Sequence, residues 1–378
     1  MFRTILISLC TGLQIYVFWR AASVPFLKRT IPRRHLIAAG IVLWAVLLLS
    51  WTLRRGSEGT WSMALEIFGM HWMALLFLCS VTLLTVDVCT AFGYLMPRQS
   101  PTLRGWALVA GVVLSLFALI QGLRPPVVQS YDVHLRNLPA EMEGGVIVAL
   151  SDLHLGSTIS ERWLAARVSQ VTEQRPDLVF LLGDIFEGHG RPERTFLPVL
   201  SGLSAPLGLW AVLGNHDFHG GRAGKIETLE EAGFQVLRNR WTEIRPGFIL
   251  AGVDDLTSLR RAGRNDDFVA QALIGRPAGA TVFLSHTPWD TEKAARAGVG
   301  LMLCGHTHGG QIWPLDYLIR RRYPILEGRY DIDGMPVIVS RGAGTWGPRM
   351  RLWHPGEILR ITLHSYERKN PPVMNIPP

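Results

Sequence analysis

Long apolar segments are concentrated in the first third of the chain. A helix needs about 20 mostly apolar residues to cross hydrocarbon about 30 Å thick. Four segments reach or approach that length, from about Phe2 to Phe18, from His35 to Leu53, within Leu65 to Tyr94, and from Trp106 to Leu123. Residues 1–123 are therefore expected to form a transmembrane region of about four helices.

Two features of these segments have more than one interpretation. The first segment could be a signal peptide, but polar Gln14 lies inside it and no small-residue cleavage site precedes Trp19. Three further spans follow, so we favour an uncleaved helix. The third segment contains Glu66, His71 and Asp87. Ionisable groups at membrane depth can line a conduction path, but we favour carboxylates near the interfaces and a histidine bonded to a neighbouring helix.

The basic residues are distributed as membrane-topology signals. The formal net charge of +8 could indicate nucleic-acid binding, but many of the charges flank apolar segments, so nucleic acid is not an expected partner. The loops after the first and third spans contain Arg20, Lys28, Arg29, Arg33, Arg34, Arg98 and Arg104, whereas the other side has Arg3, Arg54, Arg55 and Arg124, offset by Glu58. Because Lys and Arg accumulate on the cytoplasmic side, we expect a bacterial inner-membrane protein with its C-terminal domain outside the cytoplasm.

Beyond Arg124 the pattern changes to short apolar runs separated by helical stretches. Pro125 and Pro126 end the fourth span. Five runs are apolar on both faces, as buried strands are: Val146–Leu150, Leu178–Leu182, Leu209–Leu213, Thr281–Ser285 and Leu301–Cys304. Between the first two, Glu161–Gln174 has apolar residues at helical spacing. This alternation favours an α/β domain over residues 124–364, followed by a polar tail over 365–378.

Each of the five runs is followed within two residues by an Asp, Asn or His. The residues at these ends are Asp152 and His154, Asp184, Asn215-His216-Asp217, His286, and His306 with His308. Ligand sites in open α/β sheets lie at the carboxyl ends of the strands. One such motif alone is typical of an ordinary turn, but five in succession predict a single cluster of oxygen and nitrogen donors.

Metal chemistry accounts for these residue types. Two cations about 3.5–4 Å apart can bind a phosphate ester, lower the pKa of a water between them and stabilise the attacking and leaving oxygens. A mixed set of carboxylate, amide and imidazole ligands suits Mn, Fe or Zn better than Ca or Mg. The pattern therefore predicts two divalent metal ions and a phosphate-ester substrate.

Together these motifs resemble the signature of the calcineurin-like metallophosphoesterases over residues 127–364. Gly252-Val253-Asp254-Asp255, Gly309-Gly310-Gln311 and Ser340-Arg341-Gly342 with Gly344-Thr345 resemble its bacterial YkuE/YaeI-like branch. The resemblance implies a four-layer αββα sandwich. It also implies hydrolysis of phosphate esters by a metal-bridging hydroxide, without a covalent enzyme intermediate.

The same resemblance implies a role for each motif residue. The ligands of the first metal would be Asp152, His154, Asp184 and His308, and those of the second Asp184, Asn215, His286 and His306. Asp184 would bridge the two. His216 is expected near the phosphate, where it assists the leaving oxygen, with Asp217 orienting it. Glu187 stands where the family often has Asp and is not among the ligands.

Two segments near these motifs combine aromatic or aliphatic residues with arginines, which suits an anionic lipid surface. One is Trp313–Tyr323, and the other contains Trp346, Arg349, Met350, Arg351, Leu352 and Trp353. They suggest a phosphodiesterase acting on lipid headgroups at the bilayer, although both segments could instead pack on the domain. The alternatives are a tethered phosphodiesterase for soluble substrates and a non-catalytic metal-binding sensor or transporter. The His216-Asp217 pair favours catalysis.

Overall fold

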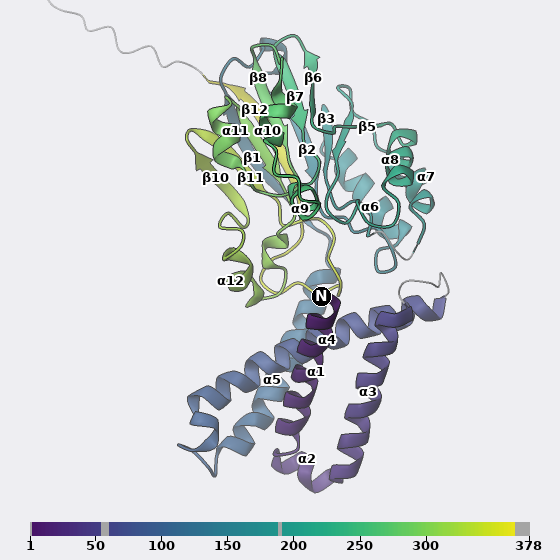
Figure 1. The fold of residues 1–378 in the computed structure, drawn as a ribbon, viewed down its shortest axis with the longest axis vertical. Coiled ribbons are helices and arrows are strands. Elements are labelled where there is room, and N and C mark those ends of the chain that lie inside the picture. The colour runs from purple at the N-terminus through teal and green to yellow at the C-terminus, as the bar shows by residue number, and fades with distance from the viewer. Residues whose placement is uncertain (1, 54–59, 188–190, 367–378) are drawn as a thin grey trace, which may run out of the picture.

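The computed structural model describes residues 2–53, 60–187 and 191–366 (Figure 1). A helical region formed by the N-terminal third lies below an α/β domain formed by the rest (Figure 1). Arg54, Arg55 and Glu58, which were used to compare the charges on the two sides of the membrane, lie outside the described residues. Residues 367–378 of the expected polar tail also lie outside them.

In the part of the chain that the structure describes, four helices are long and apolar enough to cross a membrane, by length and composition. They are α1 (Phe2–Ala21), α3 (Arg33–Leu53), α4 (Thr60–Cys89) and α5 (Ser100–Leu123). A short helix, α2 (Pro25–Thr30), joins α1 to α3, and a 3₁₀ turn, η1 (Ala91–Gly93), follows α4. The four helices coincide with the four expected apolar segments, although α4 and α5 begin earlier than the hydropathy pattern indicates.

The ionisable residues of α4 differ in part from expectation. The expected bond from His71 to a neighbouring helix is wrong, because its Nδ1 lies 2.7 Å from a backbone carbonyl one turn earlier in α4. Asp87 is fully buried and contacts Arg20 of α1 at 2.7 Å and Arg104 of α5 at 2.9 Å, and Tyr16 donates to it. A buried carboxylate needs such partners. The α1–α3 and α4–α5 connections therefore lie at the same end of the bundle.

Over its described residues, the α/β domain contains two six-stranded sheets. The first has the order β1 (Val127–Leu135), β12 (Glu357–Ser365), β2 (Val146–Leu150), β3 (Leu178–Leu182), β4 (Leu209–Val212) and β5 (Phe234–Val236). The second has the order β10 (Gly328–Ile332), β11 (Met335–Val339), β9 (Leu301–Cys304), β8 (Ala280–Leu284), β7 (Phe248–Gly252) and β6 (Arg240–Arg245). Strands β2 to β5 run parallel, as do β7, β8, β9 and β11. The five strands expected from the sequence are all present.

The two sheets pack face to face, with helices on both outer sides, which confirms the expected αββα sandwich. In β3, Phe180 and Leu182 face the other sheet while Val179 and Leu181 face helices, as the two-residue repeat of a strand requires. The helices beside the first sheet are α6 (Glu161–Thr172), α7 (Leu197–Leu200) and α8 (Arg222–Glu231). Those beside the second are α9 (Leu256–Arg261), α10 (Phe268–Leu273) and α11 (Thr291–Arg296).

The domain packs on the membrane helices through segments that follow β9 and β11. Ile312, Met350 and Leu352 form an apolar cluster with residues of α4 and α5, and the Arg351 amide donates to the carbonyl of Ala118 at 2.9 Å. Helix α12 (Leu315–Arg320) lies at the edge of the domain nearest the helical region (Figure 1). Because Met350, Arg351 and Leu352 are buried, the expectation that they belong to a lipid-binding patch is wrong.

Candidate metal centre

The carboxyl ends of five strands place the expected site residues at one edge of the sandwich. Asp152 and His154 follow β2, Asp184 follows β3, Asn215 to Asp217 follow β4, His286 follows β8, and His306 and His308 follow β9. Among the described residues, the carboxylate oxygens and imidazole nitrogens form three overlapping groups, in each of which all donor atoms lie within 4.8 Å of one another. The groups contain Asp152, His154, Asp184, His216, His286, His306 and His308. Residues more than 150 positions apart in the sequence, such as Asp152 and His308, thus lie in one cluster.

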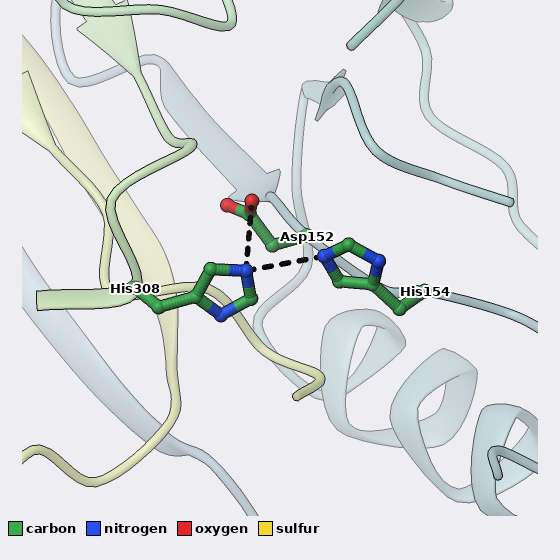
Figure 2. Close-up of side chains that lie close together, drawn as sticks. All are labelled: Asp152, His154 and His308. Atoms are coloured by element: carbon green, nitrogen blue, oxygen red, sulfur yellow. Dashed lines mark hydrogen bonds and ion pairs between the residues drawn. The ribbon is translucent and has the colours of Figure 1, made fainter. Parts of the chain in front are cut away.

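The first group contains Asp152, His154 and His308 (Figure 2). His308 Nε2 lies 3.3 Å from Asp152 Oδ1 and 3.1 Å from His154 Nε2. The two imidazoles face one another through ring nitrogens rather than through carbon edges (Figure 2). Two nitrogens and one carboxylate oxygen therefore converge on a single point.

Asp184 links the other two groups, His154–Asp184–His216 and Asp184–His286–His306. Its Oδ2 lies 3.3 Å from His286 Nε2 and 3.8 Å from His154 Nε2. His286 Nε2 is also 3.2 Å from His306 Nδ1. Asp184 is thus the carboxylate that lies between the two sets of imidazoles, where a residue bridging two cations would have to be.

Three of the imidazoles are oriented by a contact on their other nitrogen. Glu187 Oε2 lies 2.5 Å from His154 Nδ1, and the carbonyl that ends β3 lies 2.7 Å from His286 Nδ1. The hydroxyl of Tyr323 lies 2.7 Å from His306 Nε2. Contacts of this kind fix the tautomer and direction of metal-binding histidines. In each ring the remaining nitrogen points into the centre.

The backbone at these positions is held in an unusual conformation. Asp152, His154, Asp184, His306 and His308 all have positive φ, between 47° and 74°. Non-glycine residues rarely adopt this region, and those that do often lie at functional sites. Adjacent glycines make room for it, since a Cβ on the glycine before Asn215 would lie 2.2 Å from the Asp184 carboxylate. The loops after these strands therefore have an unusual backbone conformation that directs the side chains of Asp152, His154, Asp184, His306 and His308 into the centre.

Asp217 makes contacts that the motifs did not predict. Its carboxylate accepts backbone N–H bonds from Gly214 at 2.9 Å and Phe186 at 2.9 Å, which ties the β3 and β4 loops together. Among the described residues no hydrogen bond joins this carboxylate to the His216 ring, so the orienting role expected for Asp217 stays a prediction. The carboxylate beside His216 is that of Glu187, 3.4 Å from Nδ1.

Glu187 and Tyr323 are site residues that the motifs did not reveal. Glu187 lies three residues after Asp184 and contacts both His154 and His216. An acidic residue inside an otherwise apolar, buried segment is the one signal that could have identified it. Tyr323 ends the Trp313–Tyr323 segment, and no local pattern distinguishes it from a residue that packs on the domain.

The electrostatics of the centre favour a bound cation. Burial lowers the pKa of His306 to about 4 and also holds the pKa of His308 well below its usual value, so both rings are neutral, as a metal-binding imidazole must be. Burial opposes the charged form of His286, but the Asp184 carboxylate raises the pKa of this ring to about 10. Burial also opposes the charged form of His216, but the carboxylates of Glu187 and Asp184 raise its pKa to about 9. Burial also opposes ionisation of Asp184, yet the nearby imidazoles hold its pKa well below normal. The carboxylates thus draw positive charge to the positions that metals would occupy.

An orphaned oxygen supports the same conclusion. Asn215 Oδ1 is buried and has no hydrogen-bond partner within the described part of the chain. A buried amide oxygen without a partner is costly. Metal coordination would satisfy it, so the residues present fit the divalent cations that the sequence motifs imply.

Comparison with known proteins identifies the family. Residues 145–310 match the calcineurin-like phosphoesterase family. An uncharacterized metallophosphoesterase of Campylobacter jejuni is 31% identical over 259 residues, covering 67% of this chain and 68% of that protein. The chain belongs to the calcineurin-like phosphoesterases. This metallophosphoesterase is also 29% identical to the protein YkuE of Bacillus subtilis over 64% of the chain and 88% of that protein, which confirms the resemblance to that branch.

The metallophosphoesterase also resembles proteins with a membrane region. A Bos taurus protein named transmembrane protein with metallophosphoesterase domain is 31% identical over 326 residues, covering 80% of this chain and 73% of that protein. The alignment is longer than the α/β domain alone, so it extends into the apolar helices. Family membership implies hydrolysis of phosphoric esters with divalent metals, and the four apolar helices indicate association with a membrane.

Proposed function

We propose that this metallophosphoesterase is a membrane-anchored hydrolase with two divalent metals, of Mn, Fe or Zn type, which acts on phosphate esters at the bilayer surface. The observation that supports it best is the position of Asp184 between two converging sets of imidazoles. One metal would be held by Asp152, His154, Asp184 and His308, and the other by Asp184, Asn215, His286 and His306. Bound cations would supply positive charge for the phosphate and an activated water.

His216 is the residue proposed to assist the leaving oxygen. Its side chain is 16% exposed while its neighbours His154 and Asp184 are almost fully buried. It therefore lies at the solvent side of the centre, with its Nδ1 toward Glu187. The Glu187 carboxylate beside the ring favours its protonated form, and the pKa of His216 is raised in the metal-free protein. We propose that this proton is donated as the ester bond breaks.

The environment of the centre supports a substrate at the membrane. Only three residues separate His308 from Ile312, which packs on α4 and α5. Just beyond, Tyr317 and Leu318 on α12 are 66% and 65% exposed, and Arg320 and Arg321 beside them are also exposed. Exposed aromatic and aliphatic groups beside arginines suit an anionic lipid interface. The edge that would bear the metals thus lies next to the apolar helices, which supports a substrate held at the bilayer that they would span.

Orientation remains part of the proposal. Arg20 and Arg104 lie together at the end of the bundle opposite the point where α5 leads into the α/β domain. Because basic residues accumulate on the cytoplasmic side, we place that end in the cytoplasm of a bacterial cell and the metal centre outside it. A reporter fused to the C-terminus would test this, and a cytoplasmic signal would overturn it.

Catalysis is tested with a chromogenic diester, bis(p-nitrophenyl) phosphate, on detergent-solubilised protein. Hydrolysis should require added Mn²⁺ and fall by at least about a hundredfold in Asp184→Asn and His216→Ala. Glu161→Gln is the matched control, since this carboxylate forms a partly exposed pair with Arg191. Metal binding without any hydrolysis would favour the alternative of a non-catalytic sensor or transporter.

The substrate surface is tested with a second set of variants. Tyr317→Ser and Leu318→Ser, combined with Arg320→Gln and Arg321→Gln, should reduce turnover of anionic phospholipid in vesicles while sparing the soluble diester. Ile274→Ser with Arg245→Gln makes similar changes at exposed positions elsewhere on the domain. Equal loss, or no loss, with both substrates would contradict the lipid proposal and favour a tethered phosphodiesterase for soluble substrates.

A further inference from the structure

A separate cavity of about 270 Å³ lies beside the metal centre. It is lined by Thr257, Arg260, Arg261, Trp289, Arg322 and Tyr323. Half of this lining is arginine, and none of these six residues belongs to the proposed metal ligands. The cavity is therefore a different chemical environment from the centre of carboxylates and imidazoles.

The cavity is built on the same loops that position the metal ligands. Tyr323 lines it and places its hydroxyl 2.7 Å from His306 Nε2. On another wall, the hydroxyl of Thr257 donates to Asp255. The second oxygen of Asp255 accepts a bond from Thr287, at 2.5 Å, and Thr287 directly follows His286. A group in the cavity would thus be one side chain, Tyr323, away from the proposed ligand His306. It would be connected to the neighbour of the proposed ligand His286 through the chain of bonds from Thr257 to Asp255 to Thr287.

Aromatic stacking holds two of the guanidinium groups. Arg260 Cζ and Arg322 Cζ lie 4.4 Å and 4.6 Å from the ring centre of Trp289. That ring stacks on Tyr323 at 5.5 Å with an interplanar angle of 18°. A cation–π contact with the ring limits the motion of a guanidinium group, which leaves its N–H groups preorganised for the oxygens of a phosphate or carboxylate.

The cavity also has an excess of positive charge. Arg260 pairs with Asp290 at 3.0 Å, and Asp290 is shared with Lys293 at 3.8 Å. Within the described ranges, Arg261 and Arg322 form no ion pair with a carboxylate. Two guanidinium groups are thus available to an anion, next to a centre that would hold another.

We propose that this cavity binds a second anionic group of the substrate, a phosphate or carboxylate joined through a short linker to the scissile phosphate ester. The inference rests on the proposed hydrolase function and specifies its substrate class. A simple diester with one charge would leave the cavity unfilled. A bisphosphate, either a nucleotide or a lipid with two phosphates, would occupy both positions.

Paired substrates test this for soluble esters. The p-nitrophenyl ester of thymidine 5′-phosphate would be compared with the same ester carrying an additional 3′-phosphate. The native protein should show a higher kcat/KM for the second, and Arg261→Gln or Arg322→Gln should reduce that preference by about five- to tenfold each. Arg245→Gln, an equal charge change at the opposite end of the sheet beside the start of β7, should leave the preference unchanged.

A lipid arm distinguishes the source of the second anion. Mixed micelles would contain either phosphatidylglycerol, with one phosphate, or cardiolipin, with two. A preference for the two-phosphate member that is lost in Arg322→Gln, in either arm, supports the cavity and names its source. Absence of a preference in both arms, while metal-dependent hydrolysis persists, overturns the cavity and leaves the hydrolase function intact.

Binding measurements separate the two proposals if hydrolysis is absent. Equilibrium dialysis with Mn²⁺ would compare thymidine 3′,5′-bisphosphate with thymidine 5′-monophosphate on the full-length protein. Affinity for the bisphosphate about tenfold higher, and abolished by combining Arg261→Gln with Arg322→Gln, would support the cavity even without catalysis. Equal affinities would overturn it.

Discussion

Replacement of Glu187 tests whether the metal centre depends on a carboxylate that is not itself a ligand. Its Oε2 contacts His154 Nδ1 at 2.5 Å and lies 3.4 Å from His216 Nδ1. The first is a charge-assisted contact on the far side of a proposed ligand, which keeps His154 Nε2 directed at His308. Removal of this carboxylate should leave the ligands in place but free the His154 ring to rotate.

The expected magnitude follows from what each variant retains. Loss of a group that orients a metal-binding histidine typically costs 10–100-fold in metal affinity or activity, or about 1.4–2.7 kcal/mol. Glu187→Gln keeps an oxygen that can accept from His154 Nδ1, so we expect about a tenfold loss of Mn²⁺ affinity. Glu187→Ala removes the acceptor altogether and should cost closer to a hundredfold. Glu187→Asp should fall between native and Gln.

The assay is calorimetric titration of metal-stripped protein in detergent, because it reads metal affinity without relying on turnover. Glu161→Gln controls for loss of a carboxylate from a pair that does not contact a ligand. Thermal unfolding of each variant shows whether the fold is retained. Native Mn²⁺ affinity in a folded Glu187→Ala protein would refute the view that this residue orients the centre.

Three further predictions follow from the same contacts. Chelation of divalent metal should lower the melting temperature, since a cation at a hundred times its Kd stabilises the folded protein by about 2.7 kcal/mol. Added Mn²⁺ should restore the melting temperature, and an unchanged melting curve would contradict occupancy of the centre. Arg351→Gln removes a fully buried guanidinium that donates to the carbonyls of Arg341 at 2.8 Å and Gly344 at 2.6 Å. This change should destabilise the domain by about 3 kcal/mol in denaturant unfolding, and a loss below about 1 kcal/mol would contradict a stabilising role for these bonds. Asp87→Asn leaves Arg20 and Arg104 buried without their counter-charge and should cost about 3–5 kcal/mol, measured by thermal unfolding in detergent, with partial recovery when Arg104→Gln is added.

The part of the centre that could be predicted from sequence is the part set by local structure. An apolar strand followed by Asp184 or His286 is visible in a few consecutive residues, because burial of the strand and its polar end are both local. The sandwich follows from the alternation of such strands with helices. The positive φ at Asp152 and His308 was not visible in the same way, since nothing in the residue type demands it.

The contacts that sequence could not reveal join segments that are distant along the chain. Glu187 and His154 are 33 residues apart, and Tyr323 and His306 are 17 apart. The bond from the Phe186 amide to Asp217 was not visible for the same reason, since these two residues are 31 apart. In the sequence, an arginine near aromatic residues could either bind a lipid surface or pack on the domain. In the structure Arg351 is buried, whereas Arg320 is exposed.

The attachment of the domain to the membrane helices restricts what can reach the metals. Gln311, three residues after His308, accepts a backbone bond from Leu352 at 2.9 Å and donates from its side chain to the carbonyl of Trp346 at 2.9 Å. The segment between these two partners packs on α5 through Arg351 and Ala118. The loop that supplies His308 is therefore held against the bundle by hydrogen bonds and apolar packing together. In the proposed function, such a connection would keep the centre at one height above a bilayer spanned by the four apolar helices, so a substrate anchored in the lipid would need a headgroup of matching reach. The vesicle experiment measures the proposed preference for a membrane-borne phosphate ester over a soluble one directly.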